Sequence, residues 1–532
     1  MPMKKITLLF ISFTFISTVA FSQMIQGEIA IGGNQSDQGA SACQTKDGGY
    51  AMTGYTQSFG VGGSDVYVAN FDKKGTLKWA EAIGGAAFDA GNSIIQDKSG
   101  DFVIAGYTMS FGAGKVNVYV IKLDSNGNKL WTETIGGASY DEGKCIIQTK
   151  DGGYAIGGYS GSFGNGGPSD FYVIKLTVNG TIQWTKTIGG GGDEEAYTIV
   201  QTKDGGYALS GYTMSFGAGN ADGYAVKLDS TGNLKWTITM GGPLGDALYG
   251  ITQLKDKSYI VTGYTYHYGN NDLFLVKIDS SGNKKWSKVI GGPGNDIGEA
   301  VIQNKEGDIV VVGSTTSYGS GTNDVYLLKL DTAGTIIWTR TAGGPSNEFG
   351  YTLSQTTDDG YVVGGYTDSY GAGGDDFYLV KFDSLGHTCM SPEGGGGTDS
   401  TWGIAGSGGA VSSGGTITSK DSGRITKAGI WVDTCKVLGT EGINTIASLP
   451  DRITVYPNPT TNTLYVEFSS VSTSQTKYTL QVYDITGRVL LTYSLSQTPY
   501  PISLDVSSLS RGMYFLSIQS EAGIEVKKFM KE

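Results

Sequence analysis

One segment of about 52 residues is repeated along most of this chain, and this repetition constrains the fold more than any other feature. Its clearest landmark is a tryptophan followed four residues later by an Ile-Gly-Gly-like turn. The landmark tryptophans are Trp79, Trp131, Trp184, Trp236, Trp286 and Trp338, with spacings of 52, 53, 52, 50 and 52 residues. A fixed period of this size is typical of repeat proteins, in which each copy is one supersecondary unit.

Each repeat is predicted to contain four strands, as the third copy illustrates. Its short runs rich in apolar, β-branched and aromatic residues lie at 144–149, 154–159, 170–176 and 182–188. Asp-Gly and Asn-Gly turns separate two pairs of these runs, and such turns are strong signals for hairpins. No stretch within the repeats has helical apolar spacing over a useful length. One copy therefore has the size and pattern of a four-stranded propeller blade.

The two ends of the repeat region indicate how the array closes. The seventh copy has strands at 351–355, 361–367 and 377–382 but lacks the tryptophan strand. Residues 25–33 align with that missing strand, with Gly27 in the place of the tryptophan. An open solenoid would need capping units and would leave exposed edges. We therefore predict an all-β fold in which residues 23–383 form a seven-bladed β-propeller closed by the N-terminal strand.

The segments outside the repeats differ in composition from them. Lys4 and Lys5 precede an apolar run and small residues, so residues 1–22 are predicted to be a signal peptide that is cleaved between Ser22 and Gln23. No later apolar run is long enough to span a membrane, so we expect no transmembrane helix after cleavage. Residues 384–450 read as a Gly/Ser-rich linker or small β element, and residues 451–532 as a small C-terminal β-sandwich.

Four cysteines fall into two groups. Cys389 and Cys435 flank the non-repeat segment and are the candidate disulfide, which an exported protein permits. Cys43 and Cys145 occupy corresponding strands of the first and third copies. We expect these two to be free, buried thiols that behave as small apolar residues.

Charge and composition exclude some classes of function. The formal net charge is −12 and only 17% of residues are charged, which disfavours nucleic acid and anionic membranes as partners. The two histidines form no cluster with metal-ligand spacing, and no nucleophile or phosphate-binding motif is present. We therefore predict no cofactor, no metal site and no catalytic residue. Paired carboxylates for glycoside hydrolysis remain an alternative. Acidic residues are most concentrated at Asp193-Glu194-Glu195 and Asp375-Asp376.

An acidic residue recurs in the loop that enters the first strand of every copy. In a propeller this loop lies near the central mouth, so a ring of acids there would bind a cation or a polyhydroxylated ligand. The alternative is that each carboxylate caps its own turn. The candidate ring comprises Asp37, Asp89, Asp141, Asp193, Asp246, Asp296 and Glu348.

Three other residue types recur in most copies. A glutamine at the end of each first strand either lines a channel or hydrogen-bonds the backbone between blades. Tyrosines in Gly-Tyr-Thr-like segments, with Phe59, Phe111 and Phe216 four places later in three copies, either stack on sugars or pack blade against blade. The tryptophans are expected to pack. The glutamines are Gln44, Gln96, Gln148, Gln201, Gln253, Gln303 and Gln355.

The C-terminal segment carries motifs that do not repeat. They are an opening Tyr-Pro-Asn-Pro, an Asp-x-x-Gly-Arg turn, a Gly-x-Tyr-x-Leu strand and a basic end. The residues are Tyr456, Pro457, Asn458, Pro459, Gly487, Arg488, Gly512, Lys527 and Lys528.

These motifs closely resemble the type A C-terminal sorting domain of the Bacteroidetes type IX secretion system. The resemblance implies export to the periplasm, passage across the outer membrane by the type IX machinery, and removal of the tail with release or attachment at the surface. The repeats resemble the Gly-Gly-Tyr propeller repeats of exported proteins from the same bacteria.

These observations together favour a secreted or cell-surface propeller that acts as a non-catalytic binding or adhesion module for glycan or protein. A secreted polysaccharide hydrolase or lyase, with acidic residues at the propeller mouth, is the alternative. A purely structural surface-layer protein is a third reading, because propellers host many activities.

Overall fold

The protein divides into two compact units, residues 1–437 and 438–532. The computed structural model describes residues 26–388 except Asn165, Tyr268 and Ala372, six short stretches between residues 398 and 437, and most of residues 453–531. Every regular element in these parts is a β-strand. The predicted signal peptide, with Ser22 and Gln23, lies outside the described residues.

Each repeat contributes one antiparallel sheet, and we number the sheets 1 to 7 by the order of their first strands. The first strands are β2 (Asp37–Gln44), β6 (Asp89–Gln96), β10 (Asp141–Gln148), β14 (Glu194–Gln201), β18 (Asp246–Gln253), β22 (Asp296–Gln303) and β26 (Glu348–Gln355). The second strands are β3 (Tyr50–Thr56), β7 (Phe102–Thr108), β11 (Tyr154–Ser160), β15 (Tyr207–Thr213), β19 (Tyr259–His267), β23 (Ile309–Thr315) and β27 (Tyr361–Thr367).

The third and fourth strands complete the repeat sheets. The third strands are β4 (Asp65–Phe71), β8 (Asn117–Leu123), β12 (Asp170–Leu176), β16 (Asp222–Leu228), β20 (Asn270–Ile278), β24 (Asp324–Leu330) and β28 (Asp376–Phe382). The fourth strands of sheets 1 to 6 are β5 (Leu77–Gly84), β9 (Lys129–Gly136), β13 (Ile182–Gly189), β17 (Leu234–Gly241), β21 (Lys284–Gly291) and β25 (Ile336–Ala342).

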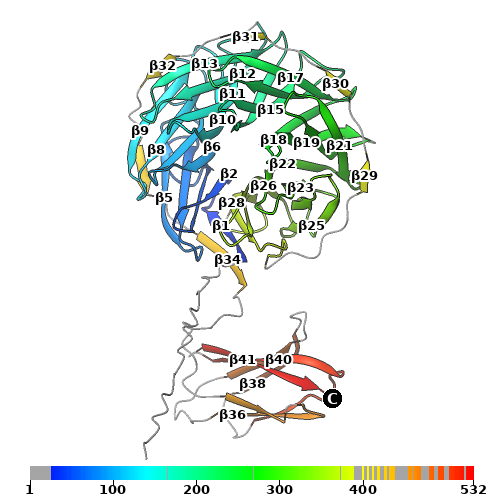
Figure 1. Ribbon diagram of the computed structural model, residues 1–532. Coiled ribbons are helices and arrows are strands. Elements are labelled where there is room, and N and C mark those ends of the chain that lie inside the picture. The colour runs from blue at the N-terminus through cyan, green and yellow to red at the C-terminus, as the bar shows by residue number, and fades with distance from the viewer. Residues whose placement is uncertain are drawn as a thin grey trace, which may run out of the picture. The chain divides into compact units, whose positions relative to one another are not determined.

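Sheet 7 takes its fourth strand from the other end of the repeat region. Strand β1 (Gln26–Gly32) pairs antiparallel with β28, with Ile29 opposite Leu379. The four-stranded sheets are arranged around a common axis with the first strands innermost (Figure 1). The repeats therefore form a propeller-like array in which strands from distant parts of the chain share one sheet.

The turns and the core explain why each repeat folds in this way. In the first copy, Asp72 accepts hydrogen bonds from the backbone N–H groups of Lys74 and Thr76, and Gly75 adopts a φ of 72°, which glycine tolerates best. Apolar side chains gather between neighbouring sheets: Val66 and Val68 of sheet 1 share a cluster with Ile104 of sheet 2. The burial of both faces explains the continuous apolar third strands.

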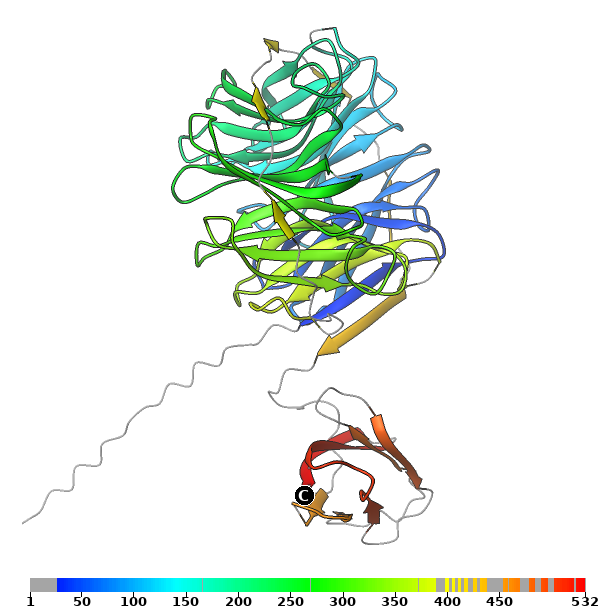
Figure 2. The same cartoon turned by 90° about the vertical axis from the view of Figure 1, so that its right-hand side faces the viewer.

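Six strands lie between residues 398 and 437. Each of them adds to the outer edge of a repeat sheet, as Figures 1 and 2 show at the rim. We call these six strands the belt. In chain order it comprises β29 (Thr398–Ser400) on β21, β30 (Ile404–Gly406) on β17, β31 (Ala410–Ser412) on β13, β32 (Thr416–Ser419) on β9, β33 (Arg424–Lys427) on β5 and β34 (Trp431–Val437) on β1.

The belt runs around the array in the direction opposite to the repeats, from sheet 5 through sheets 4, 3, 2 and 1 to sheet 7. Among the described residues, sheet 6 alone has no fifth strand. Of the two readings of residues 384–450, the small β element applies to the belt, although its strands belong to the repeat sheets. Sequence reasoning missed this because five of the six belt strands have only three or four residues, too few to show a periodic pattern.

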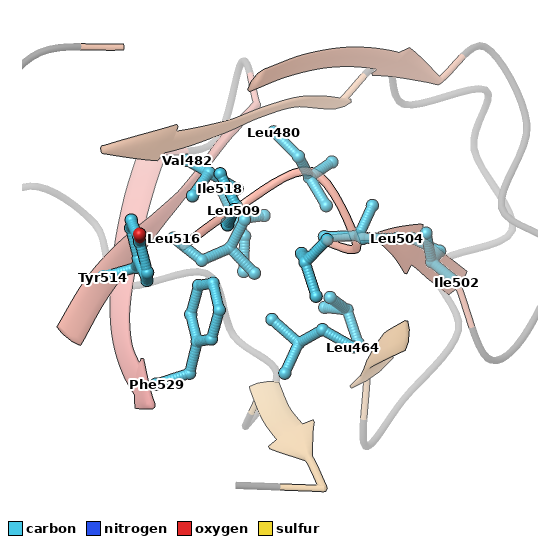
Figure 3. Packing of buried hydrophobic residues seen from close by; sticks show 12 residues of the cluster. Leu464, Leu480, Val482, Ile502, Leu504, Leu509, Tyr514, Leu516, Ile518 and Phe529 are labelled. Atoms are coloured by element: carbon cyan, nitrogen blue, oxygen red, sulfur yellow. The ribbon is translucent and has the colours of Figure 1, made fainter. Parts of the chain in front are cut away.

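The second unit contains two antiparallel sheets. One has β35 (Ile453–Tyr456), β36 (Thr463–Phe468) and β39 (Ile502–Asp505). The other has β38 (Val489–Leu495), β37 (Tyr478–Tyr483), β40 (Gly512–Ser520) and β41 (Gly523–Lys531). Apolar side chains of both sheets, including Leu464, Leu480 and Leu516, form one buried cluster (Figure 3). The two sheets therefore share one apolar core.

Candidate functional site at the central channel

The predicted acidic ring does not line the mouth of the channel. Asp37, Asp89, Asp141, Asp246, Asp296 and Glu348 are 0–1% exposed. In sheet 1, Asp37 accepts hydrogen bonds from the backbone N–H of Gly33 at 2.7 Å and from the hydroxyl of Ser58 at 2.7 Å. The same two contacts recur in sheet 3 around Asp141. These carboxylates cap their turns, which is the alternative reading of the pattern.

Sheet 4 requires a correction to the predicted ring. Glu194 occupies the capping place there, because its carboxylate accepts from the backbone N–H of Gly190 at 2.7 Å and is fully buried. Asp193, which the sequence spacing suggested, lies one residue earlier and accepts from the hydroxyl of Ser169 at 3.1 Å. Glu194 reaches its turn as Glu348 does in sheet 7, and aspartates do so in the other five sheets.

A second buried acid faces the capping acid at six of the seven sheet boundaries. Asp65 at the start of β4 and Asp89 at the start of β6 both approach Gly84, and a Cβ at that position would overlap both carboxylates. This crowding explains why the turn after each tryptophan strand begins with glycine. Asn117 replaces the second acid at the boundary of sheets 2 and 3.

The recurring glutamines join neighbouring sheets, which is the second of the two readings of this pattern. Gln96 accepts from the backbone N–H of Lys46 in the preceding sheet at 2.7 Å and donates to Gly100 O at 2.9 Å. The tryptophans also pack across sheet boundaries: the rings of Trp79 and Phe102 lie 5.5 Å apart, and Trp79 donates to Ser125 O at 3.1 Å. Both residue types are therefore structural.

The residues that differ between repeats lie on the first strands, which surround the channel. At the fourth position of these strands, sheets 4, 5 and 7 carry tyrosine, whereas sheets 1, 2, 3 and 6 do not. The fourth-position residues in order are Ala40, Asn92, Lys144, Tyr197, Tyr249, Glu299 and Tyr351. Sequence reasoning missed this position, although aligning the first strands would have shown its divergence.

Small side chains on sheets 1 and 2 leave a pocket on one side of the channel. Its volume is about 510 Å³, which falls in the range of about 300–1,000 Å³ typical of small-ligand sites. The opposite side of the channel is occupied by aromatic rings, since Tyr197 and Tyr249 contact each other with centroids 4.8 Å apart. The pocket's polar and aromatic lining comprises Gln38, Tyr55, Asn92, Tyr107, Tyr140, Glu142, Lys144 and Tyr351.

Glu142 is the centre of a hydrogen-bond network in this pocket. Its Oε1 accepts from Lys144 at 2.6 Å and from the Asn92 amide at 2.8 Å, and its Oε2 accepts from the Tyr159 hydroxyl at 2.8 Å. Burial, followed by the charge of Glu142, raises the pKa of the Tyr159 hydroxyl. Lys144 also lies over the Tyr159 ring, 5.5 Å from its centroid. The carboxylate of Glu142 is thus held in one orientation, and the ammonium of Lys144 balances its charge.

Two other glutamates on the first strands have perturbed acidity. Burial raises the pKa of Glu299 to about 8, and Tyr249 and Tyr351 are close enough to respond to its charge. Burial also raises the pKa of Glu195, against the opposing effect of Lys144. The Glu195 carboxylate accepts from the Tyr197 hydroxyl at 3.3 Å.

The remaining predicted residues are placed as follows. Cys43 and Cys145 are free, and burial raises the pKa of each thiol to about 12. Cys389 lies outside the described residues, so the candidate pair with Cys435 stays a prediction.

Of the tail motifs, Tyr456 stacks on Tyr465, and Gly512, Lys527 and Lys528 lie on the paired strands β40 and β41. Pro457 and Pro459 are exposed, whereas Asn458, Gly487 and Arg488 are outside the described residues.

Two family comparisons match parts of the chain. Residues 454–532 match the family described as the secretion system C-terminal sorting domain. Residues 454–532 are a type IX secretion sorting domain. This domain indicates secretion or attachment at the outer-membrane surface, and it implies handling by the secretion machinery. Residues 169–375 match the family described as outer membrane protein assembly factor BamB, in keeping with propeller-like repeats.

A comparison with curated proteins gives no match. Among solved structures, Sqt1 from Chaetomium thermophilum aligns with a TM-score of 0.38 and 11% identity, over 67% of this chain and 99% of that one. Within the described residues, no helix has the length and hydrophobicity that a membrane crossing requires. In the same residues, no three or more His, Cys, Asp or Glu side chains are grouped so as to hold a metal ion.

Proposed function

We propose that this protein is a secreted or cell-surface propeller that binds an extracellular glycan or protein without catalysis. The single observation that supports this function is the one-sided pocket in the channel, formed where Ala40 and Asn92 replace the tyrosine of other repeats. Its ionic groups, Glu142 and Lys144, are already paired with each other. A neutralised, aromatic-lined recess suits recognition better than it suits proton transfer.

The proposal includes the full architecture predicted from the repeat. A signal peptide occupies residues 1–22, a closed seven-bladed propeller residues 23–383, and the sorting domain residues 451–532. Closure is supported by the pairing of β1 with β28. It is also supported by the packing of Phe377 and Leu379 in sheet 7 with Met52 and Tyr67 in sheet 1.

The experiment that tests the binding function is a screen of the full-length chain on glycan and extracellular-protein arrays. We expect saturable binding of at least one ligand class, and we expect Asn92→Tyr, which narrows the pocket, to weaken that binding. The matched control is Ala333→Tyr, which adds the same ring on an exposed turn. Absence of any ligand on both arrays would contradict the function.

A polysaccharide hydrolase or lyase is the second candidate, and one observation favours it. Burial raises the pKa of Glu299 to about 8, and this shift favours the protonated form that a general acid needs. The test is to assay a panel of polysaccharides with the wild-type chain and with Glu299→Gln and Glu195→Gln. Turnover that both variants abolish supports an enzyme, and no turnover of any substrate argues against it.

A further inference from the structure

We propose that the channel pocket recognises an uncharged sugar, one or two residues long, stacked between tyrosine rings. This inference rests on the proposed binding function and narrows it to one chemical class. Three features of the pocket support it: its shape, the ion pair that balances its charges, and the aromatic side chains in its walls.

The shape of the pocket follows from the fourth position of the first strands. Tyr197, Tyr249 and Tyr351 fill the channel on sheets 4, 5 and 7, whereas Ala40 and Asn92 leave room on sheets 1 and 2. The resulting pocket of about 510 Å³ is of small-ligand size and opens at the channel. A long polymer therefore enters with one end or one short segment.

The charges of the pocket are balanced without a ligand. Lys144 donates to Glu142 at 2.6 Å, and both side chains are largely buried. A charged ligand would have to replace one member of this pair and leave the other ion desolvated, which is unfavourable. An uncharged ligand leaves the pair intact, so the pocket discriminates in favour of neutral groups.

Hydrogen-bonding groups remain available for hydroxyl groups of a ligand. Asn92 uses its amide hydrogens on Glu142 and Gly143 O, at 2.8 and 2.9 Å, which leaves its carbonyl oxygen to accept. Gln38 donates to Asp375 at 2.6 Å and is thereby held in place, with its own carbonyl oxygen free to accept. Carbonyl oxygens fixed in this way can accept hydrogen bonds from the hydroxyl groups of a sugar.

Tyrosine rings supply the apolar part of the recognition. Tyr55, Tyr107 and Tyr351 line the pocket, and Tyr140 at its edge is 45% exposed. The ammonium of Lys115 lies over this ring, 5.0 Å from its centroid. A sugar presents a C–H face and a hydroxyl edge, and an aromatic wall beside fixed amides is complementary to both.

The experiment is calorimetric titration of the full-length chain with three classes of disaccharide. The neutral probes are cellobiose, maltose and mannobiose, the anionic probe is digalacturonate, and the cationic probe is the glucosamine dimer. We expect saturable binding of a neutral disaccharide and at least tenfold weaker binding of the charged ones. Ala40→Tyr and Asn92→Tyr should each weaken neutral binding at least tenfold, and Ala333→Tyr should leave it unchanged.

Lys144→Met provides a second variant that does not depend on adding bulk. It leaves Glu142 without its ammonium partner, so the preference should shift from the neutral toward the cationic disaccharide. Failure of every neutral probe, or neutral binding that survives Ala40→Tyr and Asn92→Tyr, overturns the inference. If those same variants instead weaken binding of a charged glycan or of a protein from the arrays, the binding function stands and only the assignment to a neutral sugar is wrong.

Discussion

The side chain of Gln44 in sheet 1 accepts a hydrogen bond from the backbone N–H of Thr357 in sheet 7, at 3.0 Å. The same contact joins each other pair of neighbouring sheets, for example Gln148 with Lys98 N at 2.9 Å. Sheets 7 and 1 are thus linked by the same type of hydrogen bond as the other neighbouring sheets.

Gln44→Ala tests this join. We expect it to lower the free energy of unfolding by about 1 kcal/mol, the usual net value of one hydrogen bond, and to do so as much as the internal control Gln148→Ala. Urea denaturation measures both. A loss for Gln148→Ala with none for Gln44→Ala would mean that sheets 1 and 7 are not closed on each other.

Removing Lys122, which pairs with the buried Asp97, should lower the free energy of unfolding by more. Lys122 contacts Asp97 at 2.9 Å, and the side chain of Asp97 is only 1% exposed. Burial opposes ionisation of Asp97, but hydrogen bonds from Ser99, Lys122 and Tyr154 lower its pKa to about 2. Lys122→Met should therefore cost about 3 kcal/mol or more, because it leaves an unpaired buried charge.

Lys175→Met is the matched control for that change. Lys175 pairs with Asp151 at 3.0 Å, but the Asp151 side chain is 54% exposed and water can solvate it. We expect a loss of about 1 kcal/mol or less. Equal losses for the two variants, measured by thermal unfolding, would contradict this explanation.

The facing acids predict how stability changes with pH. Burial and then the charge of Asp89 raise the pKa of Asp65 to about 6, although a hydrogen bond from Val61 N opposes this; Asp272 and Asp324 behave in the same way. A raised carboxyl pKa means that the folded state binds the proton more tightly than the unfolded chain does. This contribution is therefore present below about pH 4 and is lost as the pH rises to about 6.

Asp65→Asn mimics the natural Asn117 and removes the titrating group. We expect it to raise stability at pH 7 by about 1 kcal/mol and to change it little at pH 4. Chemical denaturation of both chains at pH 4, 5, 6 and 7 measures the difference. A variant that is less stable than the wild type at pH 7 would show that the second carboxylate is needed in its charged form.

The belt should contribute to the stability of the repeat array. A chain that stops after Thr388 loses all six belt strands, whereas one that stops after Val437 keeps them. Because each strand adds backbone hydrogen bonds to an open sheet edge, we expect the shorter chain to melt several degrees lower. Equal melting temperatures, or equal rates of proteolysis in the repeats, would show that the belt adds no stability.

The strands of the repeats could be predicted from sequence because turn residues and apolar runs recur in phase. Repetition also allowed the strand at residues 25–33 to be assigned to the seventh repeat. The same repetition misled the search for a site. It drew attention to acids such as Asp141, which recur because every turn needs a cap, as the contact with Gly137 N shows.

The pocket lay at positions that do not recur. Lys144 and Asn92 are unremarkable residues when each repeat is read alone, and only the tyrosines at the same position in other sheets show that space is left beside them. Glu142 gains its role from contacts with Asn92 and Tyr159, which come from different strands. Such relations depend on which strands face the channel, and spacing along one strand does not report them.

Strand β1 lies between β28 and β34, with Glu28 opposite Val380 on one side and Cys435 on the other. A growing chain presents residues 26–32 long before either partner exists. Sheet 7 therefore stays incomplete until residues 376–382 have been made, and its outer edge stays open until residues 431–437 follow. Nearly all of residues 26–437 must therefore be synthesised before sheet 7 can be completed. A chain that is shorter than this still has an unpaired edge on sheet 7.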